Sequence, residues 1–487
     1  MLESLSDTLT VDGSAYVFYS KYTTWANDLD APAANTAVES SYAAWREMIY
    51  GKKIASDDVC FLVDRNFWTS NTVYSYYTHT IDLESIDYYV TTDERKIYKC
   101  LFNGYGNSST SKPTSVANVP FTTADGYMWK YIYTVSQAKI DKFGDSSFTP
   151  FEANVTIQDQ SVPGALDVIV VTTSGNNWTA TDSGVVQEKI SNTLLRIATS
   201  AISTNGVYDG SGFYVSAGNG AGYLSTITTY VSNSTGNWIN LGDTANDVSF
   251  GSAYIISPRM IIDGDGTGAK AYSVVNTTSA VITGITIINT GSSYTWSDVT
   301  ANAAPTFSNS SAEFTPIIGP PGGHGSDPLD ELVSRRLCIS VSTSNNDTIP
   351  SNIEFRTAGI IVTPLHLANS AAYSNSEFRQ FEYATIVLGV GIVSPPAPKE
   401  LITGQTSGAT ATALWSNTTL LRYGDVRGTF ANSETIVSNT SSSVATISAI
   451  NNPQLLKNSG EIFYLDNFEP ITRTDVSTEK ARIIIRV

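Results

Sequence analysis

Residues 122–135 read TTADGYMWKYIYTV, an acidic Asp125-Gly126 turn followed at once by a strand-like run. Four aromatic residues take alternate positions in that run: Tyr127, Trp129, Tyr131 and Tyr133. Side chains of a strand alternate between two faces, so the four share one face, and the reverse face of Met128, Lys130, Ile132 and Thr134 is also largely apolar. A strand that is apolar on both faces is typical of one covered on both sides. We therefore predict a core or subunit interface here, rather than an exposed sugar-binding platform.

The composition of the whole chain favours strands over helices. The chain has 487 residues, enough for roughly three domains at about 150 residues each. Only 15% of the residues are charged, Ser, Thr and Asn are abundant, and 26 residues are Tyr. Polar neutral surfaces with many Tyr and β-branched residues are typical of β structure. We therefore predict a mainly β (α+β) fold.

Charge and hydropathy exclude two classes of partner. The formal net charge is −17 and the chain has no Lys/Arg-rich run, so we expect no nucleic-acid binding. The longest apolar run, at 383–393, contains two glycines and is shorter than the roughly 20 residues that cross a bilayer. The N-terminus has no apolar signal-peptide core. We expect a soluble protein without membrane insertion.

The three cysteines point to a reducing compartment. Cys60, Cys100 and Cys338 match no zinc or redox spacing, and one is left over from any single disulfide. We expect reduced core residues and folding in the cytoplasm.

One helix is marked near the N-terminus. Thr36 and Glu39 have the spacing of a capping box, and Gly51 ends the pattern. Four apolar residues between them fall on one predicted face: Val38, Tyr42, Trp45 and Ile49. Strand-like runs follow at 58–68 and 96–102, so residues 1–150 are predicted to form one α+β unit.

Two later regions of the chain differ from residues 1–150 in amino-acid composition, and each contains a weak internal repeat. Residues 155–318 are rich in Gly, Ser, Thr and Asn, and IVVTTSGNNWT from Ile169 matches ITIINTGSSYT from Ile285, which suggests two related small β units. ELITGQTSGATATA from Glu400 and ETIVSNTSSSVATI from Glu434 repeat with a period of 34. A linker, SPPAPK, precedes this second repeat, which we interpret as an inserted β module.

The sequence contains few candidates for chemistry. His324, in GGHGSD, is either a base or metal ligand near Asp327 or a loop imidazole that makes turn hydrogen bonds; we favour the second. Pro328 after Ser326 or Asp327 predicts the start of a short helix. The adjacent pair Asp330-Glu331 is interpreted as solvated helix-face charge.

A calcium loop and other catalytic motifs are not supported. DGDGTGA at 263–269 has the first two EF-hand spacings, but Val274 stands where a bidentate Glu is needed. Motifs for nucleophilic and phosphate chemistry are missing. We predict no catalytic, cofactor-binding or metal-binding residues and expect no enzyme activity and no cofactor.

Four segments in order along the chain carry a resemblance. They are AAWREMIYGKKI at 43–54, KIYKCLFN at 96–103 with ADGYMWKYIYTV at 124–135, EFRQF at 377–381, and SGEIFYLDNFEPI at 459–471. Together they resemble the baseplate wedge subunit encoded by gene eight in T-even-type contractile-tailed bacteriophages. The resemblance covers roughly 1–150, 335–390 and 455–487, and the intervening regions look like insertions.

The resemblance implies a fold and a domain map. The fold would be a layered β-sandwich with helices at its edges. The expected segments are a core part at 1–154, inserted β-rich domains at 155–318, a second core part at 319–394, the repeat module at 395–453 and closing core strands at 454–487. Candidate core or interface residues are Trp45, Tyr127, Trp129, Tyr131, Tyr133, Phe378, Arg379 and Tyr464.

The resemblance also implies a role. It implies a structural homodimer within each wedge of a tail baseplate, held by other wedge subunits, assembled in the host bacterial cytoplasm and carried in the virion. The alternative is a glycan-binding tail fibre or adhesin, which would expose its aromatic residues. A third hypothesis, a glycan hydrolase, needs a facing carboxylate pair that the sequence does not identify.

Overall fold

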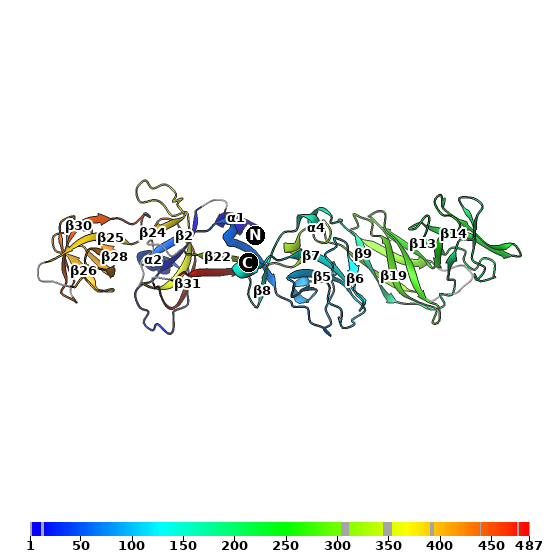
Figure 1. Ribbon diagram of the computed structural model, residues 1–487, viewed down its shortest axis with the longest axis horizontal. Helices are drawn as coiled ribbons and strands as arrows, with labels where there is room; N and C mark the ends of the chain where they lie inside the picture. Colours follow the sequence, from blue (N-terminus) through cyan, green and yellow to red (C-terminus); the bar gives the residue numbers. More distant parts are fainter. Residues whose placement is uncertain are drawn as a thin grey trace. The chain divides into compact units, whose positions relative to one another are not determined.

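The computed structural model (Figure 1) describes residues 2–10, 14–302, 311–343, 353–389, 394–438, 440–474 and 477–486. Strands make up 45% and helices 9%, which confirms the predicted mainly β fold with a few helices. The chain divides into two compact units. The first joins residues 1–62, 138–145 and 335–487, and the second joins 63–137 and 146–334.

The central sheet of the first unit is assembled from distant parts of the chain. Its strand order is β24-β2-β1-β23-β31, and blue, yellow and red ribbons meet in it (Figure 1). The bounds are β1 (Ala15–Ser20), β2 (Tyr50–Lys53), β23 (Glu354–Val362), β24 (Glu377–Arg379) and β31 (Glu461–Thr472). All neighbouring pairs are antiparallel.

One row of side chains crosses all five strands and alternates large with small. In strand order the row is Phe378, Gly51, Phe18, Gly359 and Leu465. A Cβ at Gly51 would lie 2.3 Å from the Phe378 ring, and a Cβ at Gly359 would lie 2.6 Å from Phe18 and from the Tyr464 carbonyl oxygen. Each ring therefore occupies the space above the neighbouring strand's glycine, which selects this register over others.

A second sheet covers the other face and completes a sandwich. It contains β3 (Val59–Asp64), β22 (Arg336–Ser342) and β32 (Lys480–Arg486). Val17 and Ile360 of the first sheet pack with Leu337 and Ile339 of the second, and Leu9 of α1 (Leu2–Thr10) joins them. Burial of these apolar side chains makes the largest favourable contribution to the free energy of packing the two sheets together.

All three cysteines are buried, as predicted for core residues. Cys60 and Cys338 lie directly opposite each other on β3 and β22.

The predicted N-terminal helix is shorter than expected and packs differently. Helix α2 spans Val38–Arg46, its N-cap is Ala37 without a side-chain hydrogen bond, and the chain re-enters a strand at Tyr50. The capping-box prediction for Thr36 and Glu39 was therefore wrong. Only the C-terminal turn meets the sheet, through Ala44 and Trp45, because the helix ends before Ile49 could extend its apolar face.

Residues predicted for the buried side of that helix are exposed instead. Val38 is 72% exposed and Tyr42 is 55% exposed. They lie one helical turn apart and therefore share a face.

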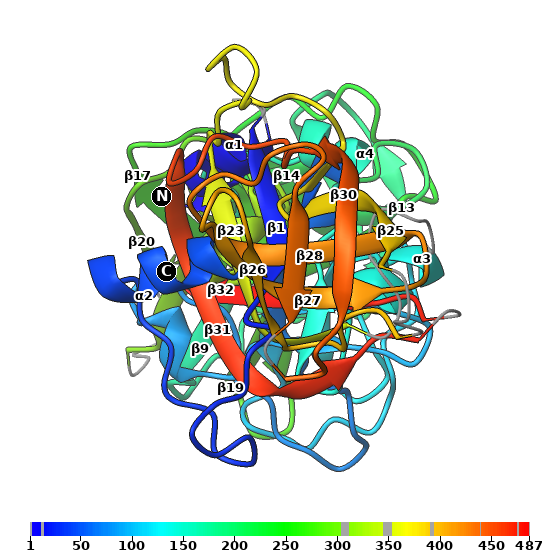
Figure 2. The ribbon, with the colours of Figure 1, turned by 90° about the vertical axis from the view of Figure 1, so that its left-hand side faces the viewer.

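The region with the 34-residue repeat forms a closed barrel of order β25-β28-β27-β26-β29-β30 (Figure 2). Its bounds are β25 (Glu382–Leu388), β26 (Leu401–Gly404), β27 (Thr410–Ser416), β28 (Leu420–Arg427), β29 (Thr435–Ser438) and β30 (Val444–Asn451). The barrel begins before the expected boundary at 395, because β25 pairs with both β28 and β30 and so closes the edges.

The two repeats of the barrel hold each other through equivalent contacts. Ser441 Oγ donates to Glu400 at 2.7 Å, and Ser407 Oγ donates to Glu434 at 2.9 Å. These pairs exchange when numbers are shifted by 34, and the pairing of Ile402 with Ser438 repeats as Gly404 with Ile436. The two repeats are thus related by a local pseudo-twofold axis, and the glutamate of each repeat accepts a hydrogen bond from a serine of the other.

The second unit begins with a small sheet of order β4-β5-β7-β6. The bounds are β4 (Tyr89–Thr91), β5 (Lys96–Asn103), β6 (Phe121–Thr122) and β7 (Tyr127–Thr134). The antiparallel pair β9 (Leu166–Thr173) and β21 (Glu313–Ile318) forms a separate two-stranded sheet. Short elements elsewhere are η1 (Ser56–Asp58), η2 (Leu83–Ser85), α3 (Gln137–Phe143), β8 (Phe148–Pro150), α4 (Val155–Asp159) and α5 (Pro328–Glu331).

Two larger sheets occupy the region predicted to hold inserted domains. The seven-stranded sheet comprises β10 (Asp182–Val185), β11 (Glu188–Lys189), β12 (Leu194–Ile197), β13 (Gly212–Ala217), β14 (Leu224–Asn233), β15 (Gly236–Leu241) and β16 (Ala253–Ser257). The four-stranded sheet comprises β17 (Arg259–Gly264), β18 (Lys270–Asn276), β19 (Val281–Asn289) and β20 (Ser297–Asn302).

The match between Ile169 and Ile285 does not mark two copies of one unit. The first segment lies on β9 and the second on β19, and the two run side by side, with Leu166 N donating to Thr290 O at 2.9 Å. The aromatic residue after each glycine turn, Trp178 or Tyr294, is buried. The similarity arises because two adjacent strands each continue into a glycine turn and a buried aromatic residue.

The compact units also divide the chain differently from the expected map. Residues 63–137, expected to share one core with residues 1–62, group with 146–334 instead. The packing of β7 accounts for this grouping in part, because its cluster includes Ile157 from the 146–334 segment.

The glycine row gives a stability prediction for the first unit. Gly359→Ala should lower the free energy of unfolding of that unit by about 1–3 kcal/mol, because the new methyl meets a backbone oxygen that cannot move aside. Calorimetry, with hydrogen exchange in β1 to assign the transition, would measure this. Gly284→Ala is the matched control, since a Cβ on that strand glycine meets nothing within 4 Å. Equal stability of the two variants would contradict the steric argument.

Candidate functional site

The residues predicted as core or interface fall into two groups. Trp45 and Phe378 pack together in the first unit, and both are buried. Tyr464 is partly buried between the two sheets of the sandwich. Arg379 lies at the junction with the barrel, where its guanidinium stands 4.3 Å from the Tyr383 ring and donates to Asn452 O at 2.9 Å.

The aromatic row lies on β7 and is covered. Tyr127 and Trp129 are 0% exposed and their rings stack at 5.5 Å. Tyr74 meets both rings edge-on, and Tyr131 packs against Tyr98 on the neighbouring strand. These contacts place the aromatic surface inside the second unit, away from solvent.

Tyr133 departs from the row because β7 contains a bulge. Tyr131 pairs with Tyr98, and Tyr133 pairs with the adjacent residue Ile97. Strand β7 therefore has one extra residue between these two pairs. Paired residues share a face of the sheet, so the bulge turns Tyr133 to the other side. There it meets Phe151 edge-on at 5.4 Å. The expectation that all four aromatics share one face therefore fails at its last member.

The acidic turn before β7 anchors the loop beside it. Asp125 accepts hydrogen bonds from Thr110 N at 2.7 Å, Ser111 N at 2.8 Å and Thr123 Oγ1 at 2.5 Å. Burial raises the pKa of this carboxyl, but the hydrogen bonds outweigh burial and hold the pKa at about 2. Asp125 is therefore charged and ties residues 109–111 to the strand.

The reverse face of β7 holds a cluster of buried and partly buried titratable groups, which we name the lysine cluster: Lys99, Lys130, Asp167, His324 and Glu331. Lys99 and Lys130 stand directly opposite each other on β5 and β7. Two like charges in such a cross-strand pair repel each other, so the pair needs nearby carboxylates. Lys99 Nζ lies 2.7 Å from Glu331 Oε2 and 3.8 Å from the centre of the Tyr77 ring. Two carboxylates and two ammonium groups balance the formal charge of the cluster.

His324 belongs to the lysine cluster and is not an exposed loop residue. Its Nδ1 lies 3.6 Å from Glu331 Oε2, its Nε2 lies 4.0 Å from Asp167 Oδ2, and its ring meets Tyr77 edge-on at 4.8 Å. The interpretation of a loop imidazole making turn hydrogen bonds was therefore wrong.

The loop that carries His324 is held by its glycines and by a helix cap. Gly323 has a φ of 93°, and a Cβ there would lie 2.4 Å from Val162 N, so only glycine fits this close approach. Gly325 N donates to Glu331 Oε1 at 2.7 Å. Of the two predicted caps of α5, Ser326 and Asp327, it is Asp327 that caps the helix, accepting from Asp330 N at 3.1 Å.

Glu331 also departs from its predicted role. It is 4% exposed, so the prediction that Asp330 and Glu331 are both solvated helix-face charges was wrong for Glu331. Burial raises the pKa of the Glu331 carboxyl, but Lys99 and His324 outweigh burial, so the pKa lies well below its usual range. The sequence held only part of the signal: a lysine inside each of two largely apolar strands requires a nearby anion, but does not identify which carboxylate it is.

Burial also lowers the pKa values of the basic groups of the cluster. Desolvation lowers the pKa of Lys99, against the opposing effect of Glu331, and lowers the pKa of Lys130. It also lowers the pKa of His324, and the Lys99 charge adds to that effect. His324 is therefore neutral at pH 7.

A cavity of about 310 Å³ adjoins the lysine cluster. Lys130, Asp167 and His324 reach its wall, together with Met128 and Ile287. Shifted pKa values beside a cavity are a pattern found at functional sites and in structural ion networks alike. Here Lys99 is wholly covered and Glu331 is committed to Lys99 and to the Gly325 amide, which is the geometry of a structural network that fastens loop 322–325 behind β7.

The DGDGTGA loop packs against the side chain of Tyr294 and is held there by hydrogen bonds. Asp265 accepts from Thr295 N at 2.8 Å and from Thr295 Oγ1 at 2.5 Å, and these bonds hold its pKa at about 2. A Cβ at Gly266 would lie 2.4 Å from the Tyr294 ring. The glycines leave room for that ring.

The described residues offer no group of three or more His, Cys, Asp or Glu side chains able to hold a metal ion. Within the same residues, no helix has the length and apolar character needed to cross a membrane.

No protein-family model and no curated protein matches this chain.

The lysine cluster predicts an acid-sensitive second unit. The unfolded chain takes up a proton on His324 near pH 6.5, whereas the folded chain resists it because its pKa is lowered. The free energy of unfolding of that unit should therefore fall as pH drops from 7 to 5. His79, whose pKa burial also lowers, contributes in the same direction.

Denaturant titrations across this pH range would measure the dependence. His324→Gln should flatten the slope, and His79→Gln should remove the remainder. His366→Gln, in the first unit, is the control. A slope unchanged in both test variants would contradict the assignment.

The same cluster predicts a large effect of removing one charge. Lys99→Met leaves Glu331 buried without its cation and should cost about 3–5 kcal/mol of stability. The double variant Lys99→Met/Glu331→Gln should recover part of that loss, because neither charge is then left unpaired. A double-mutant cycle by denaturant unfolding would measure the coupling, and simple additivity would contradict it.

Proposed function

We propose that this chain is a structural wedge subunit of a contractile phage-tail baseplate. The observation that carries the proposal is the row Phe378, Gly51, Phe18, Gly359 and Leu465. Three of its members belong to the segments that carry the resemblance: Gly51 in AAWREMIYGKKI, Phe378 in EFRQF and Leu465 in SGEIFYLDNFEPI. Segments separated by hundreds of residues are thus constrained together by one steric pattern, which supports a shared framework.

The regions outside the resembling segments also support the proposal. The seven-stranded sheet and the barrel each have a core of their own, and the four-stranded sheet shares its core with β9 and β21. Insertions that carry their own cores can be added to a framework without disturbing its register. The chain then acts through large protein surfaces, as a homodimer bound to other wedge subunits.

One exposed apolar strip suits such a contact. Val38 and Tyr42 share a face of α2, and both are largely exposed although the same helix packs on the sheet through Trp45. Exposed apolar and aromatic side chains are typical of protein interfaces. We propose this strip, which directly precedes the first resembling segment, as a contact with a wedge subunit.

The glycan-binding alternative loses the feature that first suggested it. Tyr127 and Trp129 are buried, so the aromatic row offers no platform to a sugar.

A pull-down from co-expression with the genomic neighbours, washed at high salt, tests the proposal. We expect a stoichiometric complex with two copies of this chain, and its detection in purified virions by mass spectrometry. Val38→Ser/Tyr42→Ser should weaken capture, whereas Val155→Ser, a 63% exposed valine on α4, should leave capture unchanged. A lone monomer near 52.3 kDa that is missing from virions would overturn the proposal.

A further inference from the structure

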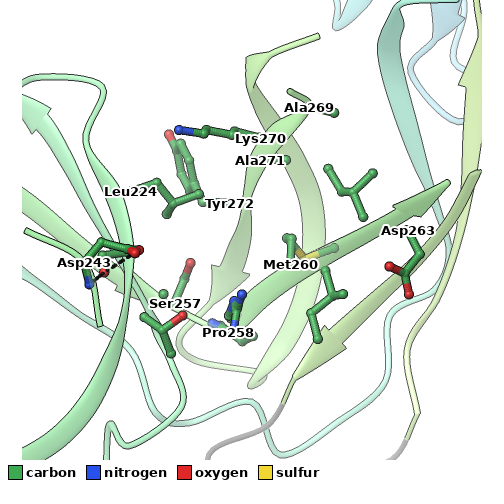
Figure 3. A pocket seen from close by; sticks show the side chains of 16 residues that line it. Leu224, Asp243, Ser257, Pro258, Met260, Asp263, Ala269, Lys270, Ala271 and Tyr272 are labelled. Carbon is green, nitrogen blue, oxygen red and sulfur yellow. Dashed lines mark hydrogen bonds between the residues drawn. The ribbon is translucent and has the colours of Figure 1, made fainter. Parts of the chain in front are cut away.

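A cleft of about 390 Å³ lies between the seven-stranded and four-stranded sheets of the second unit (Figure 3). Leu224 and Asp243 belong to the first sheet and its following loop, and Lys270 and Tyr272 belong to β18 of the second. Its volume lies within the range of about 300–1,000 Å³ that small-molecule sites occupy. Junctions between domains are also frequent positions for such sites.

The two walls of the cleft are joined rigidly. Pro258 is the one residue between β16 and β17, and Ser273 Oγ donates to its carbonyl oxygen at 2.9 Å in a buried position. Tyr214 of β13 stacks on Tyr272 of β18 at 4.6 Å with an angle of 19°. The cleft is therefore preformed, which reduces the entropy lost when a ligand binds.

Asp243 is positioned at one wall with spare hydrogen-bonding capacity. Its backbone N donates to Ser225 Oγ at 3.1 Å, and Ser225 Oγ donates to Asp243 Oδ2 at 3.2 Å. Tyr223 OH fixes the Asp243 carbonyl oxygen at 2.7 Å. Among the described residues, none donates to Asp243 Oδ1, which can therefore accept from a ligand hydroxyl.

Cations complete the polar lining. Arg259 and Lys270 both line the cleft and are exposed, and neither forms an ion pair within the described ranges. Asp243 and Asp263 balance their charge. Leu224, Met260 and Tyr272 add a limited apolar surface (Figure 3).

This lining discriminates between classes of ligand. A hydrophobic ligand would leave the carboxylates and cations unpaired, and a phosphate-like anion would face two carboxylates. A polyhydroxylated ring can donate to the carboxylates, accept from the cations and lay its C–H groups on Leu224 and Tyr272. We propose that the cleft binds a saccharide of one or two pyranose rings, with Asp243 as the main hydroxyl acceptor. This site is independent of the proposed baseplate role.

Saturation-transfer NMR of the full chain would test the proposal. The probes are the methyl pyranosides of glucose, galactose, mannose, rhamnose, N-acetylglucosamine and glucuronate, with inorganic phosphate as a further probe. We expect at least one pyranoside to bind with a Kd below about 10 mM. Asp243→Asn should weaken that binding about 10-fold or more, because it removes a charge-assisted acceptor.

Asp247→Asn is the matched control, since Asp247 is an exposed aspartate of the same loop that does not line the cleft. It should leave the affinity unchanged, and circular dichroism would check that all variants fold. Tyr272→Phe, which keeps the ring, should retain binding, whereas Tyr272→Ala should weaken it. Binding of phosphate alone, binding of no pyranoside, or equal affinity of Asp243→Asn and Asp247→Asn would each overturn the proposal.

Discussion

The steric fit between aromatic rings and glycines is the constraint on which the first unit depends. Phe18 fills the space over Gly359, and Phe378, at the edge of the row, fills the space over Gly51. A slip of one residue in any of these strands would put a side chain where a ring now lies and turn the apolar face outward. The α2 contacts and the second sheet both build on a register that this row selects.

Patterns with a clear period were predicted well from the sequence. The strands at 96–102 and 127–135, the helix start with Asp327, one of two predicted caps, and the 34-residue repeat all appear in the structure. Each of them depends on local chemistry, which neighbouring residues report directly. The end of α2 at Arg46 depends instead on β2 pairing with β1, a contact between segments that the local pattern does not contain.

The lysine cluster and the cleft were out of reach for a similar reason. Lys99 and Glu331 are 232 positions apart, and nothing near Glu331 distinguishes it from an exposed helix residue. Lysines inside two apolar strands did signal that carboxylates must lie nearby, but not which ones. The cleft depends on how Pro258 joins two sheets, and sequence periodicity carries no information on that junction.

The route of the chain through the central sheet has a consequence for its synthesis. The buried strand β1 is the first strand of this sheet to be translated, and its partner β2 follows soon after, yet its other partner, β23, begins at Glu354 and the next strand, β31, begins at Glu461. At about 5–20 residues per second, β1 waits roughly 15 to 70 seconds for β23 to be made. The sheets between 182 and 302 can fold on the ribosome during that interval. The central sheet is therefore completed after these sheets have folded, and the open side of the apolar β1 segment needs protection from aggregation until the final strands are made.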